Sequence, residues 1–176
     1  MWRKISTFNY ILFLIILFAG CTNANPALSI KLNPGIDTIE VNSEFNDAGA
    51  QATLNFRKHS VSIIQNDVDV TKVGTYSITY QTTYENITKT ITRYVDVVDQ
   101  TPPTIALNPG IDTIIINNKW IDAGVSITDN SQLDVSLEVV GEVIISSVGE
   151  YKVKYIATDK YGNKTEAIRY VNIITP

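Results

Sequence analysis

The strongest constraint on this chain is an internal duplication. The octapeptide LNPGIDTI occupies residues 32–39 and occurs again at residues 107–114, 75 positions later. The same shift aligns VGTY at residues 73–76 with VGEY at residues 148–151. A period of this length exceeds the roughly 20–50 residues of solenoid repeats. It suits a small unit that folds by itself, so we expect two tandem copies of one domain.

The first residues have the pattern of an export signal. Arg3 and Lys4 precede an apolar run at residues 10–19, which is about half the roughly 20 residues that a spanning helix needs. The segment LFAGC at residues 17–21 resembles the signal of bacterial lipoproteins. That resemblance implies cleavage before Cys21 and attachment of lipid (diacylglycerol on the sulfur, with palmitate-type acyl chains). The alternative is an ordinary cleaved signal followed by an unrelated cysteine.

The repeat, the signal and the prolines together predict the organisation of the chain. Pro102 and Pro103 interrupt strand pairing and favour a stiff, extended backbone, so we expect the two copies to lie end to end. The predicted segments are a signal peptide (1–20), the lipidated cysteine and a tether (21–26), domain 1 (27–98), a linker (99–103) and domain 2 (104–176).

Composition excludes several functions. Cys21 is the only cysteine, so the domains have no internal disulfide. Without residues 1–20 the chain has 12 basic and 18 acidic residues and a formal charge of −6, so we expect no binding to nucleic acid. A single histidine, His59, is too few for zinc. The acidic stretch at residues 129–134 has no counterpart in the first copy, so we predict neither a calcium site nor any other metal or cofactor.

Alternation of apolar and polar residues predicts strands rather than helices. Tyr76, Ile78 and Tyr80 share one face of a strand, and the second copy repeats the pattern. Short strands separated by frequent turns favour two tandem Ig-like antiparallel β-sandwiches, an all-β fold. The predicted strands are 28–32, 38–41, 50–54, 60–65, 75–82 and 88–98 in copy one, and 104–107, 113–116, 125–128, 135–140, 142–145, 150–157 and 165–174 in copy two.

Two tyrosines and two arginines are candidate structural residues. Tyr76 and Tyr151 stand two residues before Ile78 and Val153, which is the spacing of a tyrosine corner to the second core cysteine in Ig domains. We therefore expect apolar packing where those domains have a disulfide.

Arg93 and Arg169 alternate in phase with valines and should point inward, where an arginine needs a partner. Asp47 and Asp122, which occupy the same place in each copy, are the predicted partners.

The motifs of copy two resemble a known family. TPPTIALNPG (101–110), WIDAGVSITDN (120–130) and VGEYKVKYIATDKYGN (148–163) are similar to the bacterial surface Ig-like domain, which occurs in tandem in secreted Gram-positive proteins and appended to some insecticidal crystal proteins. Copy one matches more loosely, with YENI at 84–87 in place of the D-x-x-G-N turn. The resemblance implies a non-catalytic adhesion or spacer role on the extracellular face of the cell membrane.

Two other functions stay open from sequence. Phe45 and Trp120 could be platforms for a glycan in a receptor component that binds carbohydrate or protein, although filling the end of each sandwich is the simpler interpretation. A minor hydrolase would need partners around His59, and no nucleophile is evident. The predicted partners are the membrane and an unidentified surface protein or glycan. Attachment to the membrane is expected only at the N-terminus, because residues 174–176 do not form a hydrophobic tail.

Overall fold

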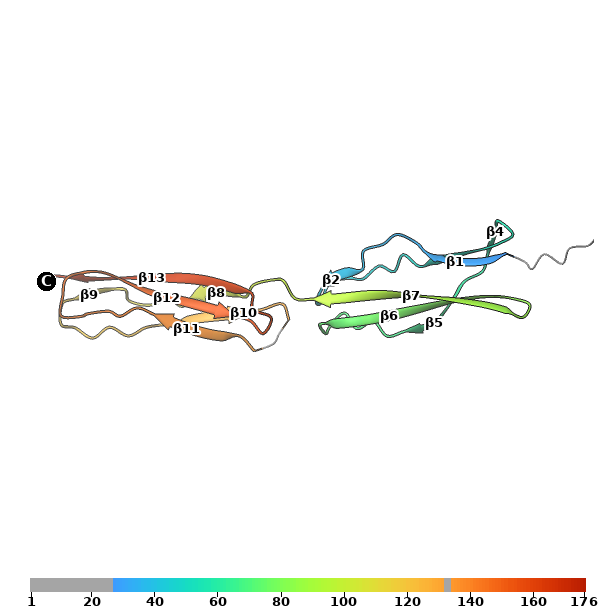
Figure 1. Ribbon diagram of the computed structural model, residues 1–176. Helices are drawn as coiled ribbons and strands as arrows, with labels where there is room; N and C mark the ends of the chain where they lie inside the picture. Colours follow the sequence, from blue (N-terminus) through green and yellow to red (C-terminus); the bar gives the residue numbers. More distant parts are fainter. Residues whose placement is uncertain (1–26, 132–133) are drawn as a thin grey trace, which may run out of the picture.

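The chain folds into two β-sandwich domains that lie end to end (Figure 1). The computed structural model describes residues 27–131 and 134–176. Domain 1 contains β1 (Leu28–Leu32), β2 (Thr38–Glu40), β3 (Ala50–Leu54), β4 (Arg57–His59), β5 (Ser62–Asn66), β6 (Gly74–Tyr84) and β7 (Ile87–Val98). Domain 2 contains β8 (Thr104–Leu107), β9 (Thr113–Ile115), β10 (Val125–Thr128), β11 (Ser136–Val140), β12 (Gly149–Thr158) and β13 (Lys164–Ile174). Within the described residues, no helix is long and apolar enough to cross a bilayer.

Each domain consists of two sheets. In domain 1 the strand orders are β1-β3-β4 and β2-β7-β6-β5, and in domain 2 they are β10-β8 and β11-β12-β13-β9. Most pairs are antiparallel, but β2 pairs with β7, and β9 with β13, in parallel. These two pairs depart from the otherwise antiparallel arrangement because residues 33–37 and 108–112 carry the chain from one sheet to the other instead of forming a hairpin.

The cores lie between the sheets and are filled by the long central strands. In β6 and β7 of domain 1, Ile78 and Val95 are completely buried. In domain 2, Val153 and Val171 are 3% and 0% exposed. Burying one such side chain stabilises the fold by about 1.5–3 kcal/mol. Ile78 and Val153 therefore supply, by packing, the cohesion between sheets that a disulfide gives to many Ig domains.

One predicted strand is absent, and another is shifted. Residues 142–145 form a loop, because Gly141 has φ of 116° and a Cβ there would lie 2.2 Å from the carbonyl oxygen of Lys152. The chain therefore turns away from the ladder, and Val143 packs against the core.

In domain 1 the strand predicted at 60–65 is β5, displaced to residues 62–66, and an unpredicted strand, β4, precedes it. The charged sequence of β4 has no alternation of apolar and polar residues. This strand forms because it pairs with β3 across a turn at Asn55 and Phe56 (φ of 48° and 67°).

Candidate functional site

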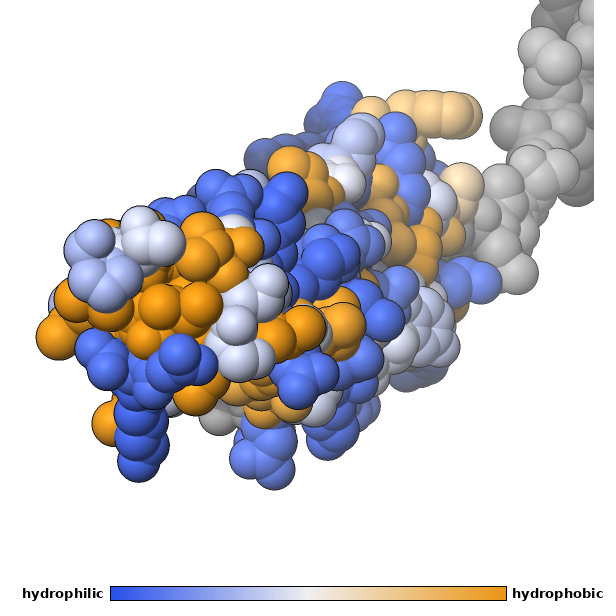
Figure 2. All heavy atoms as spheres, turned by 90° about the vertical axis from the view of Figure 1, so that its left-hand side faces the viewer, coloured by the Kyte–Doolittle hydropathy of each residue, from blue (hydrophilic) through white to orange (hydrophobic). Residues whose placement is uncertain are grey.

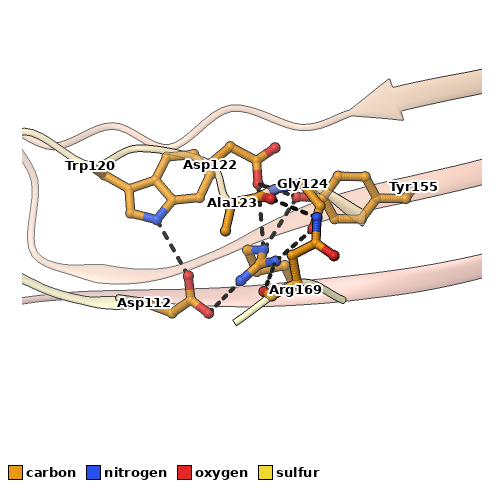
Figure 3. A network of polar contacts seen from close by, with 8 residues as sticks. Asp112, Trp120, Asp122, Ala123, Gly124, Tyr155 and Arg169 are labelled. Atoms are coloured by element: carbon orange, nitrogen blue, oxygen red, sulfur yellow. Dashed lines mark hydrogen bonds and ion pairs between the residues drawn. The ribbon is translucent and has the colours of Figure 1, made fainter. Parts of the chain in front are cut away.

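A buried arginine organises the interior of domain 2 (Figure 3). Arg169 projects from β13 and is 2% exposed. Its Nη1 lies 2.8 Å from Oδ2 of Asp112, and its Nη2 donates to the carbonyl oxygens of Asn108 (2.8 Å) and Gly124 (2.9 Å). Its Nε donates to the hydroxyl of Tyr155 at 3.3 Å. The guanidinium thus has partners on every side, which is what burial of this charge requires.

Domain 1 contains a similar network around Arg93, except that Nε of Arg93 has no hydrogen-bond partner. The guanidinium binds the carboxylate of Asp37 and donates to the carbonyl oxygens of Asn33 (2.6 Å) and Gly49 (3.1 Å). Burial opposes the charge, but the interactions with Asp37 and Tyr80 together outweigh it and raise the pKa of Arg93. Burial, together with the hydrogen bond to Asp47, raises the pKa of Tyr80 to about 12.

These networks give the duplicated octapeptide its role. It supplies the carboxylate of Asp37 or Asp112 and a backbone carbonyl to the arginine of its own domain. Its glycine permits the close approach, since a Cβ on Gly35 would lie 2.7 Å from the Cβ of Ala48, and one on Gly110 2.9 Å from that of Ala123. Each octapeptide is therefore a clamp on a buried charge.

The structure brings both predicted aspartates to their arginines. Oδ1 of Asp47 lies 3.5 Å from Nε of Arg93, and Oδ1 of Asp122 lies 3.5 Å from Nε of Arg169. The closer partner of each arginine, Asp37 in domain 1 and Asp112 in domain 2, was not predicted from the sequence. The aspartate that recurs within the duplicated octapeptide was an available signal.

The tyrosines that were predicted to form corners make backbone hydrogen bonds. The hydroxyl of Tyr76 donates to the carbonyl oxygen of Lys72 at 2.8 Å, and that of Tyr151 donates to the carbonyl oxygen of Ser147 at 2.9 Å. Each bond ties the start of a long strand to the preceding turn.

Trp120 packs against the domain 2 core, and its Nε1 lies 3.4 Å from Asp112. Phe45 is half-buried. Trp120 thus serves the interior of domain 2 rather than presenting an open face for a sugar.

His59 lies at the end of β4. Its Nε2 is 3.0 Å from the carbonyl oxygen of Thr83, and its ring meets that of Tyr84 edge to face at 6.0 Å. A backbone carbonyl and an aromatic edge neither activate nor orient a catalytic base, so this environment gives the hydrolase hypothesis no support.

The junction between the domains gathers acidic side chains that are far apart in the sequence. Asp99 follows β7, Asp129 follows β10 and Asp159 follows β12. One carboxylate oxygen from each lies within 4.8 Å of the other two. Asp99 and Asp159 are each only 6% exposed. Three carboxylates therefore converge in a mostly buried place between two domains.

Hydrogen bonds cross the junction around this cluster. The side-chain Nδ2 of Asn130 donates to the carboxylate of Glu40 at 2.9 Å, and the side-chain Nδ2 of Asn163 donates to the carbonyl oxygen of Asp99 at 3.1 Å. Glu40 also accepts from the backbone nitrogens of Gln100 and Thr101. Strand β2 and the residue that follows β7 are thereby tied to two loops of domain 2.

The electrostatics of the cluster are unbalanced. Burial raises the pKa of Asp99, and the negative charges of Asp129 and Asp159 raise it further. Hydrogen bonds from Ser131 and Thr101 lower this pKa, but the net shift is upward. Burial of Asp159 acts in the same direction, but hydrogen bonds from Asn163 and neighbouring backbone groups lower its pKa overall.

The end of domain 2 that faces away from the junction is apolar. Figure 2 looks onto this end and shows hydrophobic side chains gathered there. We call this surface the apolar tip; its side chains are 37–52% exposed and are those of Ile115, Ile144, Ile145, Val148 and Ile174. Beside it, a shallow hollow of about 190 Å³ is lined by Ile111, Ile114, Lys119 and Ile121. Ile111 and Ile121 are 76% and 69% exposed.

Together, the sheets, corners and buried arginines define a tandem Ig-like protein without a disulfide in its described domains. The family model described as "Bacterial surface protein, Ig-like domain" matches residues 35–97 and 109–173. The chain therefore belongs to this family of bacterial surface proteins, whose domains are generally non-catalytic. No curated protein matches it. Cys21 and the predicted signal peptide lie outside the described residues.

Proposed function

We propose that this protein is a non-catalytic surface lipoprotein that presents the apolar tip of domain 2 to a protein partner outside the cell. The observation that carries the proposal is the exposed group of aliphatic side chains at that end of the molecule (Figure 2). Large apolar patches on soluble domains mark interaction surfaces, because exposed hydrocarbon gains free energy when a partner covers it.

The arrangement of the chain supports adhesion over passive spacing. β1 begins at the end of domain 1 opposite the junction, and the tip lies at the far end of domain 2 (Figure 1). Lipid on Cys21, only a few residues before Leu28, would thus attach the near end to the membrane and hold the tip outward. A pure spacer has no use for an apolar end.

Adhesion is tested by adding charge to the tip. Cells that display the full protein are compared with cells that display Ile144→Lys, and attachment to immobilised extracellular matrix and host-cell surfaces is counted. Loss of one buried aliphatic contact at an interface centre should reduce binding at least about tenfold. The matched control is Ile63→Lys, an equally exposed isoleucine on edge strand β5 of domain 1. Equal attachment by both variants and the parent would leave only a spacer.

Anchoring is tested separately through the cysteine. Labelling with a clickable palmitate analogue should mark the parent protein, and Cys21→Ser should abolish both the label and retention in the membrane fraction. Retention of the unlabelled variant would contradict attachment through lipid.

A further inference from the structure

We propose that the junction between the domains binds one calcium ion through carboxylate oxygens of Asp99, Asp129 and Asp159, with the side-chain oxygen of Asn130 as a further ligand. The sequence did not predict this site. The acidic stretch at residues 129–134 was the candidate for calcium, and without a counterpart in the first copy it predicted no metal. The proposal is independent of the apolar tip and of the lipid anchor.

The first argument is the convergence of negative charge. Three carboxylates place an oxygen each within 4.8 Å of the others. Within residues 27–131 and 134–176, no ion pair joins any of the three to a lysine, arginine or histidine. Lys160, the nearest cation along the chain, is exposed. Buried like charges without a counter-ion destabilise a fold, and a bound divalent cation removes that cost.

The second argument is independent of charge. Oδ2 of Asp99, Oδ2 of Asp129 and Oδ1 of Asn130 are buried and accept no hydrogen bond. Asp99 is more than nine-tenths buried, so bulk water does not reach this oxygen. Buried polar atoms are almost always satisfied, and leaving one unpaired costs about 1–3 kcal/mol. Three unpaired oxygens in one junction indicate a ligand that is an electron-pair acceptor.

The remaining oxygens show that the cluster is held in place rather than collapsed by repulsion. Oδ1 of Asp129 accepts hydrogen bonds from the backbone nitrogen and hydroxyl of Ser131. Asp159 accepts from the backbone nitrogens of Tyr161 and Asn163, both at 2.8 Å. One oxygen of Asp129 is therefore fixed by protein donors while the other is left free for an ion.

The donor set identifies the ion. All the candidate ligands are oxygens, which disfavours zinc and copper, since sites for those ions are built mainly from nitrogen and sulfur ligands. Calcium accepts six to eight oxygens in flexible geometry, whereas magnesium demands a compact octahedron. Ligands drawn from three separate loops and completed by water fit calcium. Sites of this kind in extracellular modules have Kd of about 0.1–1 mM.

Calcium at this position would also stiffen the molecule. Asp99 directly follows β7, the last strand of domain 1, whereas Asp129 and Asp159 belong to domain 2. An ion bound to all three joins the domains directly, beside the hydrogen bonds of Glu40 and Asn163. With calcium the junction should therefore behave as a rigid strut, and without it as a hinge.

The test is isothermal titration of the full chain in detergent, after treatment with chelator, with calcium chloride. We expect saturable binding of one ion, at least tenfold weaker binding in Asp129→Asn and in Asp99→Asn, and unchanged binding in Glu138→Gln, an exposed acid of β11 that removes the same charge. Circular dichroism verifies that each variant is folded.

Several results would overturn the site. The folded parent protein could show no saturable heat up to about 10 mM calcium, well above the Kd of such modules. Glu138→Gln could weaken binding as much as Asp129→Asn, which would indicate diffuse attraction to an acidic protein. Equal affinity for magnesium chloride would remove the assignment to calcium. Small-angle X-ray scattering supplies a second measurement, because the distribution of distances between domains should narrow with calcium in the parent but not in Asp129→Asn.

Discussion

The two domains share an interior but differ at their corresponding ends. Arg93 and Arg169 are surrounded in the same way, by an octapeptide carboxylate and by two backbone carbonyls. At one end of the sandwich, domain 1 has Glu40 where domain 2 has Ile115, and Asp69 where domain 2 has Ile144. The first end meets domain 2 and is acidic; the second faces away and is apolar. One scaffold thus presents two surfaces of different chemistry, because the network that holds it lies elsewhere.

The largest effect should come from removing an arginine. Arg93→Met and Arg169→Met should each lower the free energy of unfolding by about 3–5 kcal/mol, because two carboxylates and two carbonyl oxygens lose their shared donor. Calorimetry of the full chain with urea melts measures the loss. Arg57→Met, an exposed arginine of β4, is the control and should change little. Strongly unequal costs for the two buried arginines would break the equivalence of the interiors.

An alkaline titration should reveal the tyrosines beside the arginines. The pKa of Tyr80 is raised to about 12 from an ordinary value near 10, so its neutral form is favoured by folding. Burial of the Tyr80 hydroxyl, together with its hydrogen bond to Asp47, favours this neutral form. The resulting stability is complete below pH 10 and is lost as the pH rises from 10 to 12, by roughly 2–3 kcal/mol for two pKa units.

Urea midpoints across this pH range measure the loss. Tyr80→Phe should be less stable at neutral pH and should lack that part of the alkaline decline, whereas Tyr94→Phe, which alters an exposed tyrosine, should retain it. Tyr155, whose pKa is also raised by burial and by Asp122, should follow Tyr80. An identical decline in Tyr80→Phe would mean that this hydroxyl does not contribute.

The smallest effect should come from the tyrosine corners. Tyr76→Phe and Tyr151→Phe each remove one hydroxyl that donates to a backbone carbonyl, at a cost of about 1 kcal/mol. Thermal melts of the two single variants measure these losses of stability. Equal losses would show that the two domains are equivalent at the tyrosine corner as well as around the buried arginine. A loss of zero in either domain would show that water satisfies that carbonyl equally well.

The extent to which the site could be predicted depends on how far apart its residues lie. The pairing of Arg93 with Asp47 followed from phase and repetition, because an inward arginine needs an acid and the same acid recurs in both copies. Asp37 was not predicted, because it lies in a repeated segment outside the alternating strand pattern that pointed to the arginine. The junction cluster could not be anticipated at all, since its three aspartates lie 30 residues apart and end three different strands.

The sequence by itself determined the duplication, the all-β character and the need to compensate two buried arginines, because these depend on local alternation and on the repeat. Tertiary structure alone decided which strand edges pair in parallel, which carboxylate reaches each arginine and which loops meet at the junction. The physical reason is that a side chain's partners across a sandwich are set by sheet register and by the crossing between sheets. Neither the register nor the crossing can be predicted from any short stretch of the chain.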